Sequence, residues 1–201
     1  MKAALHKVKS AQATLGFRVK SGWATAVLLA GPVQSPQVLD HRVIDLSDPA
    51  VPESKQPYHA GMGMLEEDNA KVKRRTKVVQ RVTTKSVTDL LKAYRDTGYK
   101  IRRAGLVVGS QIDPAAIANP HIRAHALEGR LFRTVLEEAL RSHRLPCLIV
   151  VERNAYSQAV AVLARAEDEL KRAVSDFGRA RSGPWRADEK MAALAAWMAL
   201  A

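Results

Sequence analysis

Three short apolar runs rich in β-forming residues open the chain, and only a few turn residues separate them. The runs cover residues 13–19, 23–31 and 37–46, with "KSG" and "PVQSP" as the two connections. Connections this short suit antiparallel neighbours, since parallel strands need a long crossover. The sequence therefore predicts a three-stranded antiparallel meander.

The rest of the chain alternates between helical and strand patterns. Helices are predicted at 66–94, 119–143 and 157–177, strands at 101–110 and 147–153, and a last helix at 186–201. Alternating units after a meander indicate a mixed five-stranded α/β sheet with helices on both faces, in the order β-β-β-α-β-α-β-α. We expect a basic N-terminal extension at 1–12, one domain at 13–180 and a C-terminal helical extension at 181–201.

The charge of the chain restricts its partners. The 201 residues carry a formal net charge of +12, which favours polyanions such as nucleic acid. No apolar segment is long enough to be a signal peptide core or a membrane span, so a soluble cytoplasmic protein is expected. Cys147 is the single cysteine and lies in the apolar run "LPCLIVV", where a buried thiol acts as a small hydrophobe.

The positive charge is concentrated in one predicted helix. Seven cations and no acid lie between residues 71 and 85, namely Lys71, Lys73, Arg74, Arg75, Lys77, Arg81 and Lys85. The alternative is a solvated helix face. Because so many like charges repel one another, a phosphate-rich partner explains the cluster better.

The order of elements resembles the ribonuclease H-like superfamily, which includes resolvases, integrases and actin-like ATPases. In its nucleases an aspartate stands in the first strand, within a segment similar to "LGFRVKSGWATAV", but here that position is Arg18. The end of the fourth strand has Gly109 and Ser110 instead of an acid, and Glu152 follows the fifth strand. One acid of three does not hold two metal ions for phosphodiester cleavage.

A second resemblance is to the middle domain of eukaryotic-type class-one peptide-chain release factors. The stretches "RAGLVVGSQ" and "PYHAGMGM" are similar to a strand of that domain and to the loop before its long basic helix. The resemblance implies a role in translation. The Gly-Gly-Gln tripeptide of that loop is replaced by Gly61-Met62-Gly63, so the resemblance does not extend to peptidyl-tRNA hydrolysis.

Titratable residues occupy the start of an otherwise apolar helix stripe. At about 100° per residue, His121, His125 and Glu128 share the stripe that continues with apolar side chains, which are Phe132, Val135, Leu136 and Ala139. Histidine suits proton transfer near neutral pH, and a helix N-terminus favours anions. Two alternatives are a hydrogen-bonded polar layer and a metal site, because histidines at i and i+4 face the same way. We assign no metal ligands and no cofactor.

These residues define a candidate site at one end of the sheet. His121, His125, Glu128 and Glu152 are the candidate catalytic residues, with Tyr58, His59, Ser110 and Gln111 beside them. The leading hypothesis is a domain that binds RNA or a ribonucleoprotein. One alternative is a hydrolase of a small phosphorylated or ester substrate, with His121 or His125 as base and Glu128 orienting it. Another is an assembly protein, with a homo-oligomer formed through the apolar helix around Trp197.

Overall fold

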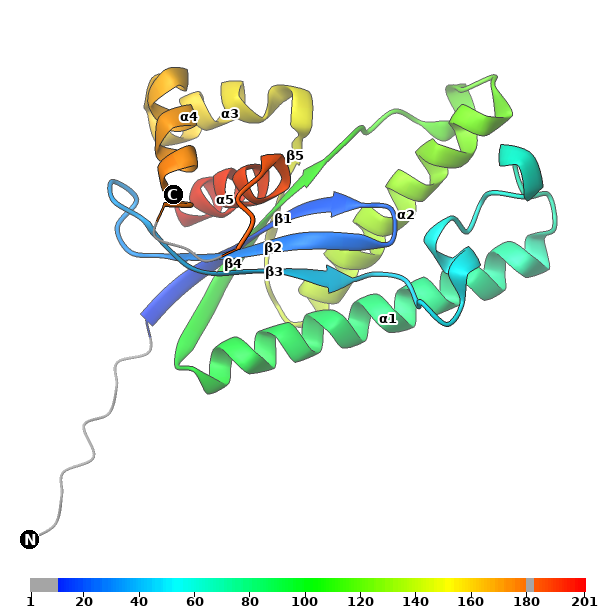
Figure 1. Cartoon of the computed structure of the whole chain (residues 1–201), viewed down its shortest axis with the longest axis horizontal. Coiled ribbons are helices and arrows are strands. Elements are labelled where there is room, and N and C mark those ends of the chain that lie inside the picture. Colours follow the sequence, from blue (N-terminus) through cyan, green and yellow to red (C-terminus); the bar gives the residue numbers. More distant parts are fainter. Residues whose placement is uncertain (1–10, 180–182) are drawn as a thin grey trace, which may run out of the picture.

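A mixed five-stranded sheet forms the centre of the computed structural model, which describes residues 11–179 and 183–201. The strands lie in the order β3-β2-β1-β4-β5 (Figure 1). Their bounds are β1 Ala11–Lys20, β2 Trp23–Ala30, β3 Gln37–Asp45, β4 Tyr99–Val108 and β5 Cys147–Val151. The first three are antiparallel, whereas β4 and β5 run parallel to β1, so the predicted meander and mixed sheet are confirmed.

Helices cover both faces of this sheet (Figure 1). On one face lie α1 (Asn69–Asp96) and α2 (Pro120–Ser142), and on the other α3 (Ala155–Leu163), α4 (Glu167–Asp176) and α5 (Ala187–Leu200). Each face has its own apolar core, because side chains alternate between the two faces along every strand. Short 3-10 turns occur at Pro52–Lys55, Gly61–Gly63, Pro114–Ala116 and Glu152–Asn154.

Both long helices begin at side-chain caps and extend beyond the sheet. The carboxylate of Asp68 accepts from the backbone of Ala70 and Lys71, and Asn119 caps α2 ahead of Pro120, as the sequence predicts. In α1 the buried side chains start only at Val79. The first turns of α1 and α2 therefore project past the carboxyl edge of β1 and β4, where side chains are free to form a site (Figure 1).

The last helix is part of the sheet's core and not a separate extension. A Cβ atom at Gly16 of β1 would lie 1.8 Å from the carbonyl oxygen of Ala192, and one at Gly105 of β4 would lie 2.3 Å from that of Ala195. The backbones can meet this closely only because glycine has no side chain. Trp197 is 1% exposed. The apolar side chains of this helix are already covered within the chain, and a homo-oligomer through it stays a prediction.

The predicted helix 157–177 is two helices. Ala164 ends α3 in the left-handed conformation, with φ of 50°, and α4 begins at Glu167. Three acids, Glu167, Asp168 and Glu169, occupy the first turn of α4, where the helix dipole favours negative charge. The break lets two short helices pack beside α5, which a single straight helix would not do. No described helix is both long and apolar enough to cross a membrane.

Candidate functional site at the carboxyl edge of the sheet

Arg18 of β1 reaches Glu152, which follows β5, across the carboxyl edge of the sheet. Its Nη2 atom lies 2.5 Å from Oε2 of Glu152, and its Nη1 donates to the carbonyl of Val19 at 2.8 Å. Asp188, in the first turn of α5, lies 3.8 Å from Arg18 Nε and 3.3 Å from Lys20 Nζ. The ends of β1 and β5 thus lie at the same edge of the sheet, where Glu152 neutralises the buried Arg18.

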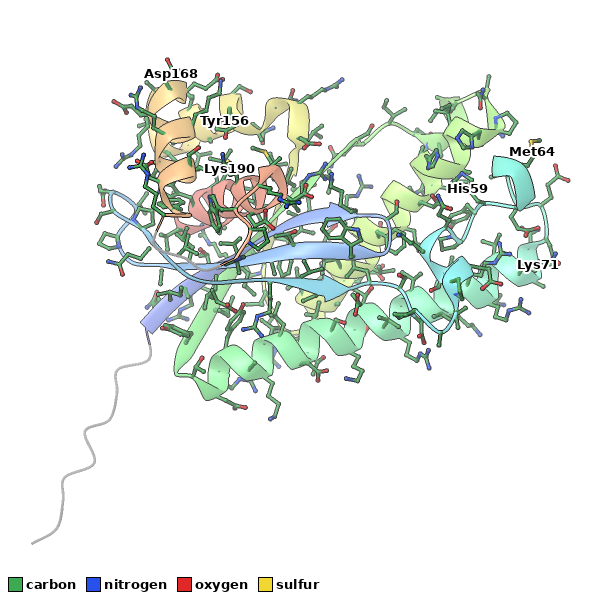
Figure 2. The ribbon with its side chains drawn as sticks, in the orientation of Figure 1. His59, Met64, Lys71, Tyr156, Asp168 and Lys190 are labelled. Atoms are coloured by element: carbon green, nitrogen blue, oxygen red, sulfur yellow. The ribbon has the colours of Figure 1, made fainter. Side chains whose placement is uncertain are left out.

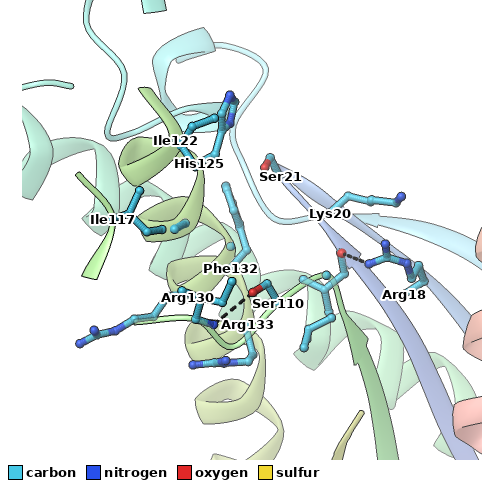
Figure 3. Close-up of a pocket in the computed structure, with 16 residues that line it drawn as sticks. Arg18, Lys20, Ser21, Ser110, Ile117, Ile122, His125, Arg130, Phe132 and Arg133 are labelled. Atoms are coloured by element: carbon cyan, nitrogen blue, oxygen red, sulfur yellow. Dashed lines mark hydrogen bonds between the residues drawn. The ribbon is translucent and has the colours of Figure 1, made fainter. Parts of the chain in front are cut away.

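A cavity of about 390 Å³ opens beside this ion pair (Figure 3). Strand ends form one wall with Arg18 and Ser110, and α2 forms the other with His125 and Phe132. Its described lining contains no carboxylate and four cationic side chains, which are Arg18, Lys20, Arg130 and Arg133. Three of these cations have acidic partners outside the lining, namely Arg18 with Glu152, Lys20 with Asp188, and Arg130 with Asp113 at 3.9 Å. The cavity therefore suits an anionic ligand chiefly at Arg133 and the exposed Arg130.

A loop at 57–66, which we term the histidine loop, closes over the first turns of α2. His59 and Leu65 form an isolated antiparallel bridge, and the backbone of Glu66 donates to the carbonyl of Tyr58 at 2.9 Å. Arg75 of α1 holds the loop by donating to the carbonyls of Pro57 and His59, at 3.2 and 3.1 Å. It also pairs with Glu66 at 3.2 Å. The predicted role of Arg75 in nucleic-acid binding stays a prediction, and in this structure its guanidinium contacts the loop and is only 12% exposed.

The histidine loop brings His59 against the two histidines of α2. Its Nδ1 atom lies 2.7 Å from Oε1 of Glu128, whose side chain is fully buried. Nδ1 of His121 lies 2.7 Å from the carbonyl oxygen of Gly63, and Nε2 of His125 lies 3.2 Å from Nε2 of His121. The structure thus brings His121, His125 and Glu128 together beside the loop, and His59 joins them.

Two atoms of this cluster are buried without a hydrogen-bond partner among the described residues, Nε2 of His59 and Oε2 of Glu128. Burial is the main effect that raises the pKa of Glu128, and the hydrogen bond with His59 partly offsets it. Burial also lowers the pKa of His125, and repulsion from His59 and His121 lowers it further. His125 is therefore mostly neutral at pH 7.

Solved structures with the same arrangement include Holliday junction resolvases. T. thermophilus RuvC in complex with a Holliday junction substrate matches with a TM-score of 0.56 and 13% identity, over 93% of this chain and 91% of that one. The chain has the ribonuclease H-like fold. The yeast mitochondrial Holliday junction resolvase matches this ribonuclease H-like chain with a TM-score of 0.50 and 10% identity, over 96% and 82% of the two chains. No family model matches the sequence, and no curated protein matches it significantly.

The basic cluster of this ribonuclease H-like domain divides into committed and free cations. Arg81 pairs with Asp48 at 2.8 Å, Lys85 with Asp89 at 2.6 Å, and Lys71 lies 3.9 Å from Asp68. Among the described residues, three exposed cations of the cluster form no ion pair within 4 Å, namely Lys73, Arg74 and Lys77. They line a shallow hollow on α1 with Ala70, Val78 and Arg81. Figure 2 shows Lys71, His59 and Met64 at the same end of the molecule.

Other predicted residues have smaller parts in the site. Ser110 lines the cavity and accepts from the backbone of Ile112 at 3.1 Å, whereas Gln111 is exposed and does not line it. Tyr58 is half-buried in the histidine loop. Sequence reasoning missed Arg130 and Arg133 as lining residues, although their spacing of three places them on one side of α2. The helical pattern predicts that Arg130 faces solvent. The pattern alone does not show which side of the helix lies beside the sheet edge, so it could not place Arg130 in the cavity.

Proposed function

We propose that this chain binds nucleic acid along the carboxyl edge of its sheet, without cleaving it there by two-metal chemistry. The observation that carries the proposal is the cavity whose described lining has no carboxylate and includes Arg130 and Arg133, at the edge where nucleases of this fold hold carboxylates. Cations bind the phosphate backbone, whereas two divalent ions need several carboxylates. Glu152 cannot serve as a free metal ligand while it neutralises Arg18 at 2.5 Å.

The free cations of α1 extend this surface. Lys73, Arg74 and Lys77 are exposed in the first turns of α1, which begins at the end of the molecule where Figure 2 places Lys71 and His59. A polyanion with several phosphates would contact both the cavity and the free cations of α1. A small anion would contact only one of these regions. RNA or a ribonucleoprotein is the partner that the release-factor resemblance favours, while the RuvC match is to a protein bound to a Holliday junction substrate.

Fluorescence anisotropy with three labelled ligands tests this proposal. Structured RNA, duplex DNA and a four-way DNA junction are titrated with the protein at several salt concentrations. We expect salt-sensitive binding that falls at least about 10-fold when Arg130 and Arg133 are both changed to Glu. The matched control changes Lys171 and Arg172 of α4, which are exposed and outside the cavity. Unchanged affinity in the cavity variant would disprove the proposed surface, and the ligand that binds tightest identifies the partner class.

A second candidate is hydrolysis of a small phosphorylated or ester substrate with His125 as general base. One observation favours it, because His125 lines the same cavity as Arg130 and Arg133, which would hold an anionic group. Its lowered pKa keeps the imidazole in the form that accepts a proton. Turnover of nitrophenyl phosphate and acetate esters that disappears in His125→Gln would support hydrolysis, and the absence of turnover in the parent would exclude it for these substrates.

A further inference from the structure

We propose that His59, His121 and His125 bind one Zn²⁺ ion through their Nε2 atoms, with Glu128 as the residue that positions two of the rings. The three histidines come from the histidine loop and two successive turns of α2. Each offers a ring nitrogen, and these nitrogens lie within 4.8 Å of one another. Binding by this set would be independent of whether the chain binds nucleic acid.

The hydrogen bonds of the rings leave Nε2 free to bind a metal. A carbonyl oxygen can only accept, so His121 must carry its hydrogen on Nδ1, which faces the Gly63 carbonyl at 2.7 Å. The Nδ1 atom of His59 lies 2.7 Å from Oε1 of Glu128, which accepts from it when the carboxyl group is ionised. A metal-bound histidine usually donates its other ring N–H to a carboxylate or backbone carbonyl, which fixes the tautomer and orients the ring. Both arrangements are present here.

The position of His125 is also explained by a shared cation. Its Nε2 atom lies 3.2 Å from Nε2 of His121, and its Nδ1 lies 3.6 Å from Oε2 of Glu128. If His125 donated from Nε2 to His121, its Nδ1 lone pair would face the carboxylate and be repelled. With the hydrogen on Nδ1, two Nε2 lone pairs face each other instead. A zinc ion between them removes this conflict, and tetrahedral ligands at 2.0–2.1 Å lie about 3.3 Å apart.

Burial gives an independent reason for a metal at this place. The side chain of His59 is 7% exposed, and its Nε2 atom has no partner among the described residues. A buried polar nitrogen without a partner is costly, and coordination would satisfy it. The unpaired Oε2 of Glu128 would accept from Nδ1 of His125 after a small rotation of the ring. One ion thus accounts for both unpaired atoms.

The chemistry of the donors favours a transition-metal ion such as Zn²⁺ over Mg²⁺. Three neutral imidazoles without an oxygen ligand suit zinc, copper, iron and nickel, of which we propose zinc, whereas Mg²⁺ prefers oxygen ligands in octahedral geometry. Because His121 and His125 are exposed, the fourth position would face solvent and hold water, as in sites with three protein ligands. His125 also lines the cationic cavity, so that water would lie beside a place for an anion.

Zinc titration of the untagged, EDTA-treated protein against a chromophoric chelator tests the site. We expect one ion per chain with micromolar or tighter affinity, and no competition from millimolar Mg²⁺. His59→Gln, His121→Gln and His125→Gln should each weaken binding at least about 100-fold. His143→Gln is the matched control, because His143 contacts Thr88 at the far end of α2. A parent without stoichiometric binding, or full affinity in His59→Gln, would overturn the three-histidine site.

Two further measurements separate ligand roles from folding. Co²⁺ bound to the parent protein should give the visible absorption spectrum of a tetrahedral ion, and X-ray absorption should show nitrogen ligands. Because both measurements use the parent protein, they do not depend on whether any variant folds. Glu128→Gln should keep the stoichiometry but weaken zinc about 10- to 100-fold, while Glu138→Gln on exposed α2 surface should not. An octahedral cobalt spectrum, or equal affinity in parent and Glu128→Gln, would refute the proposed geometry.

Gly63 offers a test outside the ligands. Its φ of +75° favours glycine, and a Cβ atom there would lie 3.0 Å from Nδ1 of His121. Gly63→Ala should therefore displace the carbonyl that orients His121 and weaken zinc binding about 10-fold. Gly61→Ala is the control, because a Cβ atom at Gly61 meets nothing within 4 Å. Equal zinc affinity in both variants would contradict the role assigned to the Gly63 carbonyl.

Discussion

Arg18 of β1 and Glu152 after β5 form an ion pair of 2.5 Å across the carboxyl edge of the sheet. The arginine side chain is 5% exposed and that of the glutamate 43%, so the buried charge depends on a half-exposed partner. This pair gives the cavity a neutral support at the carboxyl edge of the sheet.

The first prediction concerns the stability of this pair. Glu152→Gln should lower the free energy of unfolding by about 1 kcal/mol, because Arg18 loses its closest charge but keeps Asp188 nearby. Glu138→Gln, an exposed change on α2, should lie within about 0.5 kcal/mol of the parent. Urea unfolding monitored by circular dichroism measures both, and equal stabilities would show that the pair is dispensable.

The free cations of α1 are expected to act together on a polyanion. Changing Lys73, Arg74 and Lys77 to Glu should weaken nucleic-acid binding and lower the log–log salt slope by about 0.7 to 0.9 for each phosphate that the protein no longer neutralises. A charge-matched control changes Lys92, Lys171 and Arg172, which are exposed elsewhere. Anisotropy titrations from low to moderate salt give the slopes, and the same slope in both triple variants would contradict the assignment.

Arg75 should behave differently from its neighbour Arg74. Arg75→Ala removes charged hydrogen bonds to two loop carbonyls and the pair with Glu66, so it should cost about 2 kcal/mol. Hydrogen exchange of the histidine loop should rise in this variant. Arg74→Ala should change neither quantity, because Arg74 is exposed and has no acidic partner among the described residues. A stable Arg75→Ala with a protected loop would return Arg75 to the binding surface.

The buried carboxyl group of Glu128 predicts a pH dependence in metal-free protein. Its pKa is raised above the ordinary 4.5, so the folded state retains this proton more strongly than the unfolded state. The resulting stability is present below pH 4.5 and is lost as pH rises through the raised pKa. Glu128→Gln should therefore melt higher than the parent at pH 7, with a difference that shrinks toward pH 4.5. A difference independent of pH would argue against this linkage.

Cys147 should react slowly with thiol reagents. Burial raises the pKa of its thiol to about 11, so roughly one molecule in a thousand carries a thiolate at pH 8. Alkylation by iodoacetamide should be at least about 100-fold slower in the folded protein than in urea, as mass spectrometry can follow. Comparable rates in the two states would show an accessible, ionised thiol.

The sequence predicted the order of strands and helices because periods of two and of 3.6 residues are local signals. Glu128 was also predictable, since it shares a stripe with Phe132 and Ala139. His59 was harder to assign, because 69 residues separate it from Glu128 and only folding brings the loop to α2. The inward position of Arg75 could have been predicted from helical spacing, although a count of charges does not show it. Arg75 stands three residues after Val72 and four before Val79, on the inward stripe of α1.

The close contact of α5 with β1 has a kinetic consequence. Thr14 donates to the carbonyl of Ala196 at 2.8 Å, across 182 residues of chain. A domain whose core is completed by such distant segments must close a very long loop before that contact contributes, so we expect slow folding. An early intermediate would hold the sheet with α1 and α2 while its glycine-lined face stays open. Until α5 docks, the apolar face that it finally covers would stay exposed to solvent.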